Sequence, residues 1–80
     1  MVDPASIGAV VGYQAESGRL VLSSWSGDAR RLWVKFDCDP TRVPLMDLPK
    51  HVTSAEDAPK GAERPEGFLE AWCFMRRARP

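Results

Sequence analysis

The sequence predicts a small, mainly β domain with antiparallel strands, arranged as a meander or as an SH3-like barrel. Residues 7–25 contain two β-favouring runs around a short turn with a glycine, which is a hairpin signal. Residues 30–36 alternate polar and apolar side chains, as a strand with one buried face does. An α+β fold with one C-terminal helix is the alternative.

The chain has 80 residues, and we expect one domain over residues 1–80. A chain this short buries only about 60% of the surface that its unfolded form exposes, so a second subunit would add stability. The 44% hydrophobic content without a membrane-length apolar run predicts a soluble protein that does not bind membranes. The N-terminus lacks the basic region of a signal peptide, so we expect a cytoplasmic location.

The first hairpin consists of IGAVVGYQ, the turn AESG and RLVLSSW. A second short turn at residues 26–29 leads into RRLWVKFD, so three consecutive strands should be antiparallel neighbours in a meander. Period-two alternation along the second and third strands assigns one face to the core. The expected core residues are Leu20, Leu22, Leu32, Val34 and Phe36.

The second half of the chain is less regular. Three prolines between residues 40 and 49 exclude a long helix and favour irregular chain or an edge strand. Residues 53–67 are rich in charge, proline and glycine, which predicts an exposed loop. Residues 67–77 fit a helix with an apolar stripe, but their aromatic content and their alternation favour a fourth strand.

The residues that commonly carry chemistry are few. Cys38 and Cys73 lie in apolar alternation, so we expect two buried free thiols. His51 is the one histidine, and no cysteine or carboxylate stands at ligand spacing from it, so no metal site is predicted. A nucleophilic pair of Cys73 and His51 is opposed by the apolar surroundings of the thiol. We therefore expect neither an enzyme nor a cofactor, and no glycine-rich phosphate loop is present.

Asp37 and Asp39 flank Cys38 and are two residues apart, so their side chains would project to the same side of a strand. Such a pair can bind a cation. Aspartates at a strand end before a proline are more typical turn formers, and we expect that role here.

One group of aromatic and basic residues suggests binding. Arg31, Trp33 and Lys35 lie on the strand face opposite the expected core, and Trp25 would be a cross-strand neighbour. With Trp72, these tryptophans could anchor a protein partner or a second copy of the chain, which is the leading hypothesis.

The alternative function is binding of a single-stranded nucleic acid or another anionic ligand to the same face. Eleven basic residues balance eleven acidic ones, so no net charge favours it. A third interpretation is that this face is not a free binding surface. The tryptophan rings would then be covered by the 40–67 segment, the C-terminal segment or another subunit.

Two stretches resemble the WYL domain, a small barrel related to SH3 and Sm folds that occurs in bacterial transcription regulators. VVGYQAESGR at residues 10–19 is similar to its opening strand and turn, and GFLEAWCFMRR at residues 67–77 is similar to its third strand. The resemblance implies a small barrel that senses ligands or nucleic acid. The functional arginines of that family have no matching positions in these two stretches, so no residue role follows from it.

Overall fold

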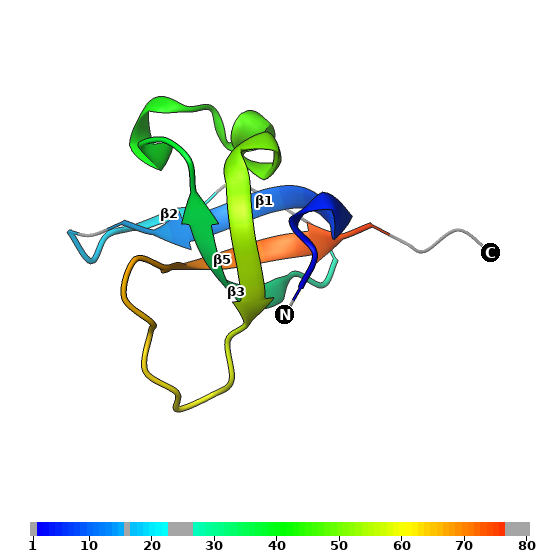
Figure 1. Cartoon of the computed structure of the whole chain (residues 1–80). Helices are drawn as coiled ribbons and strands as arrows, with labels where there is room; N and C mark the ends of the chain where they lie inside the picture. Colours follow the sequence, from blue (N-terminus) through cyan, green and yellow to red (C-terminus); the bar gives the residue numbers. More distant parts are fainter. Residues whose placement is uncertain (1, 16, 23–26, 77–80) are drawn as a thin grey trace.

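The computed structural model describes residues 2–15, 17–22 and 27–76, which form one five-stranded antiparallel sheet (Figure 1). In chain order the elements are the 3₁₀ helix η1 (Pro4–Ser6), β1 (Ile7–Gln14), β2 (Leu20–Leu22), β3 (Arg30–Phe36), the 3₁₀ helices η2 (Pro40–Arg42) and η3 (Leu45–His51), β4 (Val52–Asp57) and β5 (Leu69–Met75). The sheet order is β2-β1-β5-β3-β4. The prediction of a mainly β, antiparallel domain is confirmed.

The predicted meander is only partly right. β1 and β2 form the expected hairpin, but β3 pairs with β4 and β5 and not with β2. β5 occupies the centre of the sheet, between β1 and β3, and its Ala71 and Cys73 are completely buried. The C-terminal segment is therefore a strand, as its alternation predicts.

The chain that precedes β1 contacts the edge strand β4. Val2, which precedes β1, forms an isolated antiparallel bridge with Ala55 of β4, and the Val2 N–H donates to the Ala55 carbonyl over 2.8 Å. β4 is an edge strand of the sheet, so this bridge covers part of its open side. β2 is the other edge.

The core lies on one face of the sheet, where η3 packs against β1. Leu32 and Val34 are completely buried, as predicted, and Phe36 packs against the core from its margin. Leu20 and Leu22 are not core residues: they are 44% and 48% exposed, because the register places Val21, opposite the buried Tyr13, on the core side of β2.

The segments around β4 differ from the expected loop. In Figure 1, η2 and η3 (green) and the loop of residues 58–68 (yellow to orange) lie at opposite ends of β4. Residues 53–57 belong to β4, so the prediction of a loop over 53–67 is wrong for its first third. The buried residues of this strand, Val52 and Ala55, are three residues apart, across the register shift between Lys35 and Phe36. Because such a shift interrupts the period of two, the sequence shows no alternation that would reveal the strand.

Gly12 lets β2 approach β1 closely. A Cβ atom at this position would lie 2.3 Å from Leu22 Cδ2 and 2.9 Å from the Val21 carbonyl oxygen. We expect Gly12→Ala to lower the free energy of unfolding by about 1–3 kcal/mol, because a backbone atom as well as a side chain must move. Urea denaturation measures this.

Gly8→Ala on the same strand is the matched control. Its Cβ would lie 3.3 Å from Arg76 Cγ, which belongs to a flexible side chain, so we expect a smaller loss than for Gly12→Ala. Equal losses in the two variants would show that the approach of β2 to Gly12 does not constrain this hairpin.

Candidate functional site

The predicted aromatic face is covered by the chain itself. Trp33 is only 4% exposed, so the expectation of an exposed ring is wrong and the alternative of intramolecular cover is confirmed for this residue. β3 lies between β4 and β5, and the cross-strand neighbours of Trp33 are Glu56 and Glu70. The Arg31 guanidinium lies over the ring, 5.6 Å from its centre. Trp33 therefore offers no free surface for stacking.

The two cations of this face are also engaged within the chain. Arg31 forms an ion pair with Glu70, and the Lys35 ammonium lies over the Phe68 ring, 4.8 Å from its centre. A cation held by a carboxylate or an aromatic ring is less available for a phosphate. Of the predicted anchors, Trp72 is half-buried on β5, opposite Gly12 and Arg31, and Trp25 lies outside the described residues.

The most exposed apolar side chains of the sheet lie on β2 instead. Leu20 and Leu22 flank Val21 on a strand that, within the described part of the chain, pairs with β1 alone. Among the large hydrophobic residues that the structure describes, these two and Met46 are classed as exposed. β2 thus combines a position at the edge of the sheet with apolar side chains, and an edge of this kind can recruit another strand.

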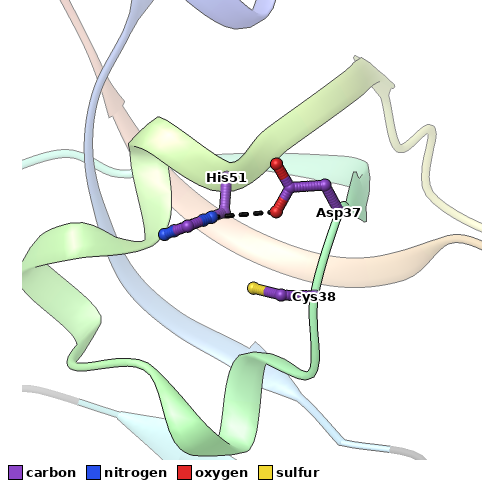
Figure 2. A group of neighbouring side chains, drawn as sticks. All are labelled: Asp37, Cys38 and His51. Carbon is purple, nitrogen blue, oxygen red and sulfur yellow. Dashed lines mark hydrogen bonds and ion pairs between the residues drawn. The ribbon is translucent and has the colours of Figure 1, made fainter.

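A second feature, which the sequence reasoning missed, brings Asp37, Cys38 and His51 together (Figure 2). Asp37 and Cys38 follow the last residue of β3, and His51 is the last residue of η3. Phe36, at the end of β3, pairs with Val52, at the start of β4, so the residues after β3 lie beside the residues before β4. The Asp37 N–H donates to the His51 carbonyl over 2.9 Å. The backbone of both segments is therefore held in place beside the cluster.

The three side chains converge on the Asp37 carboxylate. His51 Nδ1 lies 2.8 Å from Asp37 Oδ1 and donates its hydrogen to it, since a carboxylate only accepts. One ligand atom from each residue lies within 4.8 Å of the other two. Figure 2 shows the imidazole, the carboxylate and the thiol gathered around one small volume. The side chains of His51 and Asp37 are 37% and 51% exposed, so solvent reaches this volume.

The electrostatics of the cluster oppose nucleophilic catalysis by Cys38. Desolvation, a hydrogen bond to Asp37 and the negative charges of Asp37 and Asp39 raise the pKa of the Cys38 thiol. A raised pKa leaves little thiolate at neutral pH, whereas catalytic cysteines have lowered values. The pair of Cys73 and His51 does not form either, because Cys73 is completely buried in the core.

The neighbouring residues complete the surroundings of Cys38. Contrary to the prediction, Cys38 is exposed, because β3 ends at Phe36 and the buried alternation ends with it. Cys38 lines an open cleft of about 840 Å³ between this end of β3 and the loop of residues 58–68. Phe36, Asp39, Arg64 and Phe68 are other residues of its wall.

Asp37 and Asp39 have different roles. Asp39 caps η2, where its Oδ1 accepts hydrogen bonds from the Thr41 N–H and hydroxyl, and these bonds lower the pKa of Asp39. The prediction of a turn former is thus confirmed for Asp39. Asp37 instead turns toward His51, which lies 14 residues later. The signal for this contact was the pairing of β3 with β4, which the sequence reasoning did not predict.

The chain matches none of the protein-family models, curated proteins or solved structures with which it was compared. Among the described residues, no helix has the length and apolar character needed to cross a membrane.

Proposed function

We propose that this domain is a non-catalytic interaction module that self-associates through the edge of β2. The single observation that carries the proposal is that Leu20 and Leu22 are nearly half exposed on the strand at the edge of the described sheet. Edge strands of this kind pair with other chains unless charge, proline or cover prevents it. The opposite edge, β4, already has the Val2 bridge.

A second copy of the chain is the occupant that fits β2 best. If two β2 strands pair antiparallel around a two-fold axis at Val21, Leu20 of each copy lies opposite Leu22 of the other. Cross-strand apolar pairs of this kind stabilise a sheet by about 0.2–1 kcal/mol each. The contact is self-complementary, and it extends the sheet without burying a charge from Leu20–Leu22.

Nucleic acid is the weaker candidate for this chain. The face proposed for it from the sequence has a buried Trp33, an Arg31 paired with Glu70 and a Lys35 over Phe68. The equal numbers of basic and acidic residues supply no net attraction for phosphate. These observations favour a protein surface as the partner.

The test is the mass in solution as a function of concentration, measured by light scattering after size exclusion. The native chain should exceed its monomer mass of 8.9 kDa at high concentration. Leu22→Asp should weaken association at least about tenfold, because it replaces both apolar cross-strand pairs by a carboxylate opposite Leu20 of the other copy.

Met46→Asp is the matched control, since Met46 is 82% exposed on η3 and far from the edge in sequence. It should leave the association unchanged. A native chain that stays monomeric at high concentration contradicts the proposal, and so does a Met46→Asp variant that dissociates as much as Leu22→Asp.

A further inference from the structure

The cluster of Asp37, Cys38 and His51 has the composition of a metal site. It offers one carboxylate oxygen, one sulfur and one imidazole nitrogen, which are the three donor types that bind Zn²⁺ in proteins. The donors come from two segments that a backbone hydrogen bond of 2.9 Å joins, from the Asp37 N–H to the His51 carbonyl. Because the two segments already lie side by side, metal binding would cost less conformational entropy than it would between two mobile segments.

The distances are close to those of a loaded site. Zinc bonds of about 2.0–2.3 Å in a tetrahedron set its ligand atoms about 3.3–3.8 Å apart. In the structure all three candidate atoms lie within 4.8 Å of one another, and His51 Nδ1 lies 2.8 Å from Asp37 Oδ1. Side-chain rotations between staggered rotamers are the movement that would bring the three ligand atoms to these separations.

The Asp37 carboxylate supplies a negative charge for a cation at this position. It accepts a hydrogen bond from His51 Nδ1 over 2.8 Å. A cation bound between these two groups would replace that hydrogen bond and would contact the Cys38 sulfur as well. Asp39 adds a negative charge nearby, although its own oxygen is bonded to Thr41.

We propose that Asp37, Cys38 and His51 bind a divalent ion of the zinc class. The sulfur and nitrogen donors exclude Mg²⁺ and Ca²⁺ as preferred ions, since these take oxygen ligands. Three protein ligands leave a fourth position for water, as in zinc sites that remain open. The site lies on η3 and the end of β3, whereas the proposed association surface lies on β2, so the two proposals stand independently.

The experiment uses the full chain, a reductant that does not bind metal, and two probes, Zn²⁺ and Co²⁺. Zn²⁺ binding is measured by calorimetry, and we expect one ion per chain. Co²⁺ replaces Zn²⁺ as a coloured ion, and thiolate coordination should produce a near-ultraviolet sulfur-to-cobalt charge-transfer band together with visible bands of a four-coordinate ion.

Three single variants test the ligands: Asp37→Asn, Cys38→Ser and His51→Ala. Each should weaken Zn²⁺ binding at least about tenfold, and Cys38→Ser should abolish the charge-transfer band. All three positions are at least partly exposed, and circular dichroism checks that each variant remains folded.

Asp39→Asn is the matched control, because it removes the same charge two residues from Asp37 without removing a ligand. It should weaken binding by no more than about threefold. The proposal is wrong if the native chain binds no Zn²⁺, if no charge-transfer band forms with Co²⁺, or if Asp39→Asn reduces binding as much as Asp37→Asn does.

Discussion

Replacement of Leu48 by alanine is expected to lower the free energy of unfolding by about 2–5 kcal/mol. Leu48 is completely buried and is the one fully buried residue of η3, the helix that packs against β1. The shortened side chain would leave a cavity under a seven-residue 3₁₀ helix that also contains Pro49. Because domains of this size are stable by only about 4–12 kcal/mol, the loss is a large part of the total.

Urea denaturation followed by tryptophan fluorescence measures the change for Leu48→Ala. Met46→Ala in the same helix is the control, since Met46 is 82% exposed, and its effect should stay within about 0.5 kcal/mol. Similar losses in both variants would mean that η3 is stabilised by its own backbone and not by insertion of Leu48 into the core.

The second large effect is a loss of stability in alkali that depends on Cys73. Burial raises the pKa of this thiol from 9.0 to about 12. Below pH 9 both states of the chain keep the proton, so the stability does not change. Between pH 9 and pH 12 the unfolded chain releases the proton while the folded chain retains it. The free energy of unfolding should therefore fall by about 1.4 kcal/mol per pH unit, or about 4 kcal/mol in total.

Cys73→Ala isolates this contribution. Other groups also titrate in alkali, among them Tyr13, whose pKa is raised by burial and by the charge of Asp39. Those groups are present in both chains, so the difference in slope between the native chain and Cys73→Ala reports Cys73 alone. Urea denaturation at intervals from pH 8 to pH 11 supplies the slopes, and parallel curves would show that the buried thiol titrates normally.

The sequence predicted individual strands better than their arrangement. Alternation along residues 30–36 correctly assigned Leu32 and Val34 to the core, and the aromatic content of residues 67–77 correctly favoured a strand. Such patterns are local, since they depend on which face of one strand is buried. The order of strands depends on contacts between distant segments, and the insertion of β5 between β1 and β3 has no local signal.

Which face of the edge strand β2 turns to the core also depends on contacts between distant segments. Residues 20–22 read LVL, and period-two alternation with three apolar residues leaves either face available to the core. The choice depends on register, which places Val21 opposite Tyr13 and turns both leucines outward. Trp33 illustrates the reverse case, because it is buried on the face that alternation assigns to solvent. The side chain of Arg31 lies over its ring, and Glu56 and Glu70 are its cross-strand neighbours.

The sequence by itself determined the class of this domain: its composition, turns and alternation specify short antiparallel strands around a small core. Only the tertiary structure decided what is exposed. It covered Trp33, left Leu20 and Leu22 at an open edge, and brought Asp37 and Cys38 to His51. The physical reason is that strand formation follows from neighbouring residues, whereas exposure and side-chain clusters follow from pairing between segments that lie far apart along the chain.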